Sequence, residues 1–335
     1  MNHFFLISKE NWDKILVKLL GEYYVYAPIL TDNYQDYRFI LEEDINNIIY
    51  NTPKPTSPLK TFFVPVKENV VKTIPDTRMR IILGIPSCDL MALGLLDAIY
   101  LSEPLDMYYQ HKRESTILIG TDCHSILEHC HCTIYGIQPY PEKYHDISLS
   151  VLNQDVFLTI NSEKGETLFK KLSVNGLFRE TGKDELENII NKRNEIVSLL
   201  KDANKDLPDY ISTGELIKGS GEEIWQKYTK ACVSCGACAA ICPTCTCFLL
   251  IDRPEFEKVR QLDACQYPAF ERVAAGEDPL GRRHVRFRNR YLCKYVWKPQ
   301  KFEPVACTGC GRCIEACIGK ISKNELFKEL ARVLV

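Results

Sequence analysis

The sequence has no long apolar run. None of its hydrophobic stretches approaches the ~20 residues that a helix needs to cross a bilayer. The first seven residues also lack the basic segment and the extended apolar core of a secretory signal. No membrane span is predicted, and we expect a soluble cytoplasmic protein.

The sequence also lacks a surplus of either charge. It has 42 Lys and Arg residues against 44 Asp and Glu, so its net charge is −2 and the overall balance does not favour a nucleic-acid partner. One basic stretch, residues 282–291, alternates Arg with Val and Phe. We expect these arginines to balance buried negative charge or to form a docking face for another protein. No nucleic-acid binding is predicted.

Nucleotide-binding and hydrolytic motifs are missing as well. The pair Gly219 and Gly221 lacks the third glycine and the preceding strand of a dinucleotide fingerprint. Neither a P-loop nor a Gly-x-Ser-x-Gly elbow occurs. We therefore expect no flavin or NAD in this chain and no independent catalytic apparatus.

Cysteine, in contrast, is abundant and unevenly placed. Of the sixteen cysteines, four occupy positions 88, 123, 130 and 132, and twelve lie between 232 and 317. Disulfide scaffolds are usually small secreted chains with denser cysteine, whereas clustered cysteines in an intracellular chain of this size are typical of metal ligands. The pattern predicts metal centres in a reducing compartment.

Periodicity divides the chain into two regions. Helical periodicity at 9–20 and 183–201, with short apolar runs at 80–85 and 116–120, indicates helices and strands in the first two-thirds. Pro, Asp, Ser and Gly accumulate around 207–221, and a Cys-rich region follows. The predicted fold class is α+β: an N-terminal α/β domain with a mainly parallel sheet, residues 1–215, followed by a mostly helical two-cluster ferredoxin domain, residues 216–335.

One internal repeat carries most of the functional signal. The motif Cys-x2-Cys-x2-Cys-x3-Cys occurs twice, beginning at Cys232 and at Cys307. A [4Fe–4S] cubane needs four thiolates, and in two-cluster ferredoxins the fourth cysteine of each run ligates the other cluster. The repeat therefore predicts two [4Fe–4S] clusters. We expect the first quartet of ligands to be Cys232, Cys235, Cys238 and Cys317, and the second quartet to be Cys242, Cys307, Cys310 and Cys313.

The Cys-rich region leaves one alternative metal and one open question. Zinc also takes four thiolates, but zinc knuckles use pairs of cysteines rather than a triplet with a fourth at a fixed offset. Four further cysteines lie between the two runs, at Cys245, Cys247, Cys265 and Cys293. They could hold a further metal, but buried free cysteine behaves as a small apolar residue. We favour packing beside the clusters.

The N-terminal cysteines follow two predicted strands. Cys88 comes shortly after the run at 80–85, and Cys123 follows the run at 116–120. If these strands are parallel neighbours, both cysteines emerge at the carboxyl edge of the sheet, where open α/β sheets bind ligands. With Cys130 and Cys132 just downstream they would form an N-terminal quartet. We expect a third [4Fe–4S] cluster there.

Other ligand sets are open at this third site. Asp89, His124, His129 or His131 could replace one cysteine, since all four lie in the same segments. The metal could be zinc, or the cysteines could stay unliganded. A Rieske centre is not expected, because its well-separated Cys-x-His and Cys-x2-His pairs are missing.

With these segments, the chain resembles a family of 4Fe–4S dicluster proteins. The family includes the β subunit of cytoplasmic nickel–iron sulfhydrogenases and the corresponding iron–sulfur subunit of anaerobic sulfite reductase. The resemblance spans most of the chain, through residues 57–63, 87–90 and 129–132, and its most specific element is the segment 242–248. The chain departs from the family at Cys293, where histidine is usual, and before Cys88, where arginine is usual, so the branch of the family is not identified.

The resemblance implies an electron-transfer subunit of an anaerobic multi-subunit oxidoreductase. In the family, this subunit relays electrons between a flavin/NAD(P)H-binding, ferredoxin-reductase-like subunit and a catalytic redox subunit. The catalytic subunit is a hydrogenase, a sulfite reductase or a heterodisulfide-reductase-like module, and the chain itself is then not catalytic. The alternative is an enzyme whose N-terminal cluster leaves one iron open to a substrate.

Overall fold

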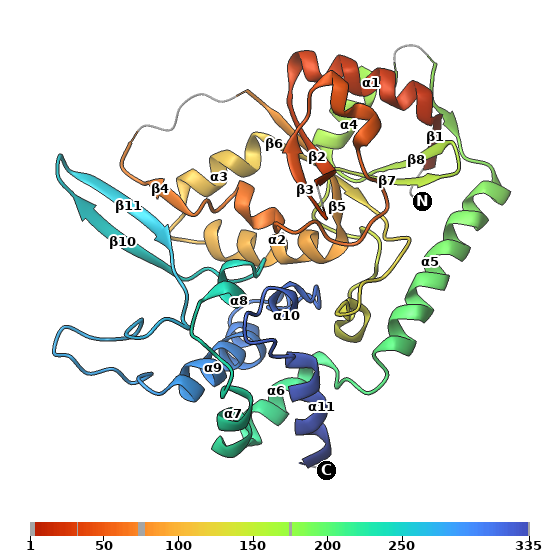
Figure 1. The fold of residues 1–335 in the computed structure, drawn as a ribbon. Helices are drawn as coiled ribbons and strands as arrows, with labels where there is room; N and C mark the ends of the chain where they lie inside the picture. The colour runs from red at the N-terminus through yellow and green to blue at the C-terminus, as the bar shows by residue number, and fades with distance from the viewer. Residues whose placement is uncertain (1–3, 32, 73–77, 174–175, 334–335) are drawn as a thin grey trace.

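The computed structural model describes residues 4–31, 33–72, 78–173 and 176–333. Within these ranges, the N-terminal part is built on an eight-stranded sheet with the order β3-β2-β5-β6-β7-β8-β1-β9 (Figure 1). Its strands are β1 (Phe4–Ser8), β2 (Tyr24–Thr31), β3 (Tyr34–Phe39), β5 (Arg80–Pro86), β6 (Thr116–Thr121), β7 (Ile147–Leu152), β8 (Asp155–Ile160) and β9 (Arg179–Glu180).

The sheet is mixed, which corrects the expectation of a mainly parallel one. The strands β2, β5, β6 and β7 pair in parallel, whereas β3 at one side and β8, β1 and β9 at the other pair antiparallel. A direct turn between neighbouring strands reverses the chain, and β7 passes into β8 through such a turn, with Asn153 at φ 57°. The parallel arrangement is therefore confined to the centre.

Helices cover both faces of this sheet (Figure 1). The helices α1 (Lys9–Glu22) and α4 (Glu163–Leu172) pack on one face, and α2 (Ser87–Tyr100) and α3 (Met107–Glu114) pack on the other. Ile81 and Leu83 belong to the first core and Ile82 to the second. Because β5 is buried on both faces, its sequence is a continuous apolar run. The predicted strands at 80–85 and 116–120 and the helix at 9–20 are confirmed.

The helix predicted at 183–201 is α5 (Lys183–Ala203). It runs along one side of the molecule from the sheet toward the C-terminal part (Figure 1). Its buried residues Ile196 and Leu200 pack in one cluster with Cys132 and Ile137. One edge of the Cys130–Cys132 segment is therefore held by α5.

The C-terminal part consists mainly of short helices around an aromatic core. Trp225, Phe287, Tyr291 and Phe327 are buried together, and Tyr135 from the N-terminal part joins the same cluster. The two regions therefore share a core. The helices are α6 (Tyr210–Gly219), α7 (Glu222–Tyr228), α8 (Ala237–Ala240), α9 (Arg283–Leu292), α10 (Arg312–Glu315) and α11 (Lys323–Val333).

A second, smaller sheet also joins the two regions. The strands β10 (Phe248–Arg253) and β11 (Glu257–Leu262) form a hairpin that projects from the molecule (Figure 1). The strand β4 (Lys67–Asn69) pairs antiparallel with β11. Buried Arg260 of β11 forms ion pairs with Glu68 of β4 and with Asp106. The segment between the two cysteine runs is thus fixed to the N-terminal part.

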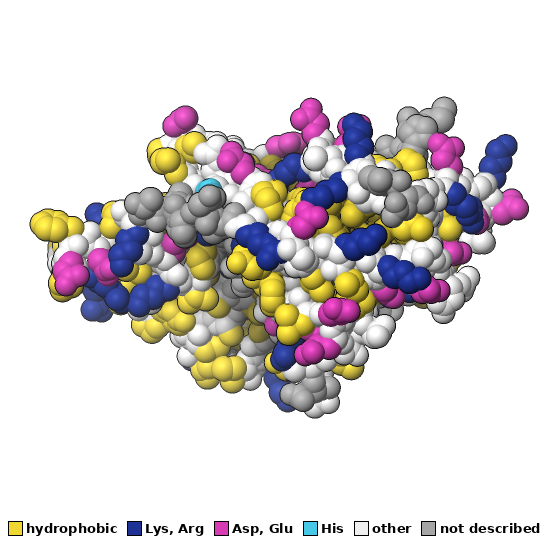
Figure 2. All heavy atoms as spheres, turned by 90° about the horizontal axis from the view of Figure 1, so that it is seen from above, with side chains coloured by type: hydrophobic (Ala, Val, Ile, Leu, Met, Phe, Trp, Pro, Cys, Tyr) yellow, Lys and Arg dark blue, Asp and Glu magenta, His cyan; other side chains and the backbone are white. Residues whose placement is uncertain are grey.

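The outer surface carries both signs of charge. Basic and acidic side chains are interspersed on the face shown in Figure 2. Exposed pairs also occur along single helices, such as Lys14 with Glu10 at 2.6 Å and Lys170 with Glu166 at 2.7 Å. Such exposed pairs contribute about 0.3–0.5 kcal/mol each. In the part of the chain that the structure describes, no helix is both long and apolar enough to span a membrane.

Candidate metal centres

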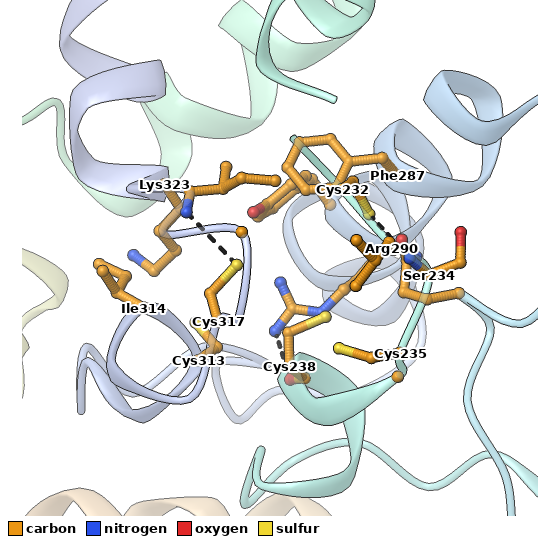
Figure 3. Close-up of a pocket in the computed structure, with 16 residues that line it drawn as sticks. Cys232, Ser234, Cys235, Cys238, Phe287, Arg290, Cys313, Ile314, Cys317 and Lys323 are labelled. Carbon is orange, nitrogen blue, oxygen red and sulfur yellow. Dashed lines mark hydrogen bonds between the residues drawn. The ribbon is translucent and has the colours of Figure 1, made fainter. Parts of the chain in front are cut away.

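The first predicted quartet surrounds one cavity (Figure 3). The cavity is lined by all four of its members, Cys232, Cys235, Cys238 and Cys317, and also by Cys313. Two of the sulfurs already accept backbone hydrogen bonds, since Ser234 N donates to Cys232 Sγ at 3.5 Å and Ile321 N donates to Cys317 Sγ at 3.3 Å. Amide donors of this kind stabilise thiolate ligands of a cluster.

The two cysteine runs have the same local structure. In each, a glycine with positive φ, Gly236 at 73° or Gly311 at 76°, precedes a short helix that carries the third cysteine of the run, α8 or α10. A side chain at Gly236 would place its Cβ 2.6 Å from the ring of Tyr267. Glycine therefore meets both a backbone and a steric requirement in the loop.

The second predicted quartet surrounds a second cavity. Cys242 from the first run lines it together with Cys307, Cys310 and Cys313 from the second run. In each cavity, three cysteines of one run thus lie with the fourth cysteine of the other run: Cys317 joins the first run, and Cys242 joins the second. This is the exchange expected of a two-cluster ferredoxin.

Buried cations line the second cavity. Lys294 is 3% exposed, and its Nζ donates to Cys242 Sγ at 3.0 Å, to Thr244 Oγ1 at 2.7 Å and to Ala306 O at 3.1 Å. Arg290 is also buried, donates to Cys238 O at 2.9 Å, and has no hydrogen-bond partner at its Nε within the described residues. Buried cations need nearby negative charge, so these groups fit thiolate-bound, anionic clusters.

The protonation of the cysteines differs with their surroundings. The hydrogen bond from Cys245 and the charge of Lys294 hold the pKa of Cys242 well below its usual range, against the effect of burial. Burial raises the pKa of Cys238 to about 11 and that of Cys310 to about 12. Because metals take the thiolate form, binding at these positions would release protons.

The N-terminal quartet also converges on a single cavity. Cys88 lies at the start of α2, directly after β5, and Cys123 follows β6, the parallel neighbour of β5. Both line a cavity together with Cys130 and Cys132. The predicted convergence at the carboxyl edge of the sheet is therefore present, and the cavity fits the third cluster as far as the donor set is concerned.

Asp89 is engaged elsewhere. Its two carboxylate oxygens accept from Arg312 Nη1 at 2.5 Å and Nη2 at 2.8 Å, and both side chains are 1% exposed. Its Oδ2 also accepts from Leu59 N at 3.3 Å. Arg312 lies between Cys310 and Cys313, so this buried ion pair connects α2 to the second cysteine run.

Two of the histidines near the N-terminal quartet, His131 and His124, are also engaged. Nδ1 of His131 is 2.8 Å from His129 O, which makes that nitrogen the donor and leaves Nε2 to accept from Lys323 Nζ at 2.7 Å. His124 Nε2 lies 3.1 Å from Ser150 Oγ. This arrangement favours the four cysteines over Asp89, His124 or His131 as ligands.

The three cavities follow one another. Cys313 lines both the first and the second cavity, and Cys310 lines both the second cavity and the N-terminal one. A Cβ at Gly309 would lie 2.6 Å from Cys132 N, so the second cysteine run packs directly on the N-terminal segment. His131 N also donates to Gly309 O at 2.9 Å. The three sites therefore form a row.

Sequence reasoning missed the cations that face the cysteines. Only the run of arginines at 282–291 indicated cations near the clusters. In the structure, Arg286 and Arg290 of this run are buried, whereas Arg282 and Arg283 are exposed. Nothing in the sequence around Lys294 or Arg312 indicated that these two side chains would be buried beside the cysteines. Across the ranges that the structure describes, no three His, Cys, Asp or Glu side chains are grouped as for a single metal ion. A cubane is larger and holds its four thiolates farther apart.

Comparisons with known proteins agree with this geometry. Residues 231–321 match the 4Fe-4S dicluster domain family. The chain is 28% identical to the β subunit of sulfhydrogenase 2 from Pyrococcus furiosus, over 95% of this chain and 99% of that protein. The predicted resemblance to sulfhydrogenase β subunits is thus confirmed.

A solved structure is less similar. One chain of the F420-reducing [NiFe] hydrogenase complex from Methanosarcina barkeri has a TM-score of 0.39 and 12% identity, and the match covers 61% of this chain and 91% of that one. A likeness of this degree supports no conclusion about fold or function.

Proposed function

We propose that this sulfhydrogenase-β-like chain is the electron-transfer subunit of a multi-subunit oxidoreductase and holds three [4Fe–4S] clusters in a row. The observation that carries the proposal is the succession of three cavities, each lined by four predicted cysteine ligands and sharing a wall with the next. Bound clusters would supply one-electron transfer, with potentials set by hydrogen bonds to sulfur, burial and charge.

The residues of the chain hold, insulate and tune these sites. The first and second quartets lie within short loops that fold around α8 and α10, and the N-terminal quartet lies at the end of a rigid sheet. Cys235 is exposed, whereas Cys132 and Cys242 are buried. Because its ligand Cys235 is exposed, we assign the first site to exchange with a partner protein.

Two partners fit this role. By its name, the relative from Pyrococcus furiosus is one subunit of a sulfhydrogenase. We propose a flavin/NAD(P)H-binding, ferredoxin-reductase-like subunit on one side of the row and a catalytic redox subunit on the other. The rival function, an enzyme with an open iron at the N-terminal site, is less well supported, because four cysteines line that cavity.

Iron content tests the proposal. The full chain, purified and reconstituted without oxygen, should bind at least about twelve irons, four for each of these three clusters. Cys123→Ala should remove about four of them, and Ser125→Ala, which alters the same cavity without removing a thiol, should remove none. Iron near zero in the parent chain would refute the electron-transfer role. Full iron in Cys123→Ala would refute the third cluster alone.

Electron transfer itself needs the partners. Anaerobic co-purification should recover a flavoprotein and a catalytic subunit, and NAD(P)H should reduce the clusters only when the flavoprotein is present. Turnover of a substrate by the isolated chain with an artificial electron donor would instead support the enzyme.

A further inference from the structure

Four cysteines lie outside the three quartets. Cys245 and Cys247 follow the last cysteine of the first run, and Cys265 follows β11. Cys293 begins a short π-helical turn, η5 (Cys293–Trp297), at the end of α9. They therefore come from three separate segments, and the fold alone decides whether they meet.

The hairpin brings two of these cysteines together. Phe248 at the start of β10 pairs with Leu262 at the end of β11, and Asp263 N donates to Cys247 O at 2.9 Å. Cys247 and Cys265 thus come from the two sides of the base of the hairpin.

The other two cysteines approach the same point. Lys294 Nζ donates to Thr244 Oγ1 at 2.7 Å and Lys298 Nζ donates to Thr244 O at 2.8 Å, so the turn that begins at Cys293 lies beside the segment that carries Cys245. Cys245 N also donates to Cys242 O of the second quartet at 3.4 Å. The segments that carry the four cysteines therefore adjoin one another next to the second cavity.

Two lysines next to this group have only neutral acceptors. Lys60 is 2% exposed, and its Nζ donates to Ala240 O at 3.2 Å and Cys245 O at 3.1 Å. Lys298 Nζ donates to Thr244 O at 2.8 Å and to Thr246 Oγ1 at 3.4 Å. Neither lysine has a carboxylate within ion-pair distance among the described residues. Buried ammonium groups are costly without negative charge nearby.

We propose that Cys245, Cys247, Cys265 and Cys293 bind a fourth iron–sulfur cluster beside the second quartet. Four thiolates are a donor set for iron–sulfur clusters or zinc, and the charge of a thiolate-bound cluster would balance Lys60 and Lys298. The position next to Cys242 adds a branch to the row of three sites, and this goes beyond the proposed function.

Iron and acid-labile sulfide counts on the full chain test the fourth site. The parent chain, reconstituted without oxygen, should bind about sixteen irons rather than about twelve. Cys247→Ala and Cys265→Ala should each lose about four irons and keep the electron paramagnetic resonance signals of the two ferredoxin clusters. Thr246→Val, between two of the cysteines, should lose none.

Other outcomes overturn the inference. About twelve irons in the parent chain and in both alanine variants would mean that the cysteines only pack, while the proposed function would stand. One zinc per chain that is lost in Cys265→Ala would identify a zinc site instead. If either variant loses every cluster, Cys293→Ala provides a further test, because it alters the end of a helix and not the base of the hairpin. Unchanged iron in Cys293→Ala would refute the fourth cluster, and a loss of about four irons would support it.

Discussion

Replacing Lys294 with methionine should lower the reduction potential of the cluster bound by the second quartet. The ammonium of Lys294 lies 3.0 Å from Cys242 Sγ in a buried position. A cation there stabilises the reduced cluster, which carries one more negative charge, over the oxidised one. The fold should tolerate the change, because Thr244 Oγ1 also donates to Ala306 O, at 2.6 Å, and leaves that carbonyl satisfied.

The expected size follows from the hydrogen bond. A hydrogen bond to a charged group contributes about 1.5–3 kcal/mol, and a tenfold change in an equilibrium constant corresponds to about 1.4 kcal/mol or to about 59 mV for one electron. The full range would be about 60–130 mV. Since the bond exists in both oxidation states and only its difference counts, we expect a decrease toward the lower end of that range.

A redox titration followed by electron paramagnetic resonance measures this potential directly. Lys294→Arg retains the positive charge and should shift the potential less than Lys294→Met does. Lys192→Met removes a lysine of α5 that pairs with Glu195 at 2.9 Å and should change nothing. An unchanged midpoint potential in Lys294→Met, with iron content equal to that of the parent chain, would refute the electrostatic role of this lysine.

Three further predictions concern stability. Asp89→Asn and Arg312→Met should each lower the free energy of unfolding by about 3–5 kcal/mol, measured by denaturant titration, because either leaves its buried partner uncompensated; equal stability of the variants and the parent would contradict the buried pair. Gly309→Ala should lower the melting temperature and release iron first from the proposed N-terminal cluster, since its Cβ would meet Cys132 N at 2.6 Å. Gly276→Ala, with a similar φ and open space around it, should cost much less. Removal of iron with a chelator should also lower the melting temperature in circular dichroism, because Lys294 and Arg290 would lose the charge that balances them; identical melting curves with and without iron would speak against that balance.

Local features of the fold and the sites were predictable. The strands β5 and β6 are continuous apolar runs because both of their faces are buried, and α5 shows the period of a helix with one buried face. The two ferredoxin quartets were predicted from the spacing within each run, because three ligands of a cubane lie on one loop, and each predicted quartet lines one cavity. The predicted convergence of Cys88 and Cys123 depends only on two neighbouring parallel strands, and it is present.

Contacts between distant segments were not predictable in the same way. The antiparallel flanks of the sheet depend on which strands become neighbours, and the pairing of β4 with β11 joins segments almost two hundred residues apart. The pair of Asp89 and Arg312 links positions separated by 223 residues. The spacing of residues within a short stretch of sequence does not indicate which distant residues will be in contact.

Local patterns along the chain indicate which cysteines stand together in runs and which of them follow a strand, because ligand spacing and strand periodicity are local properties. The folded chain adds three features: neighbouring cavities share a cysteine, Lys294 faces Cys242, and Cys247 and Cys265 come together at the base of a hairpin. These depend on burial and on charges brought together from distant segments, and such contacts exist only in the folded chain.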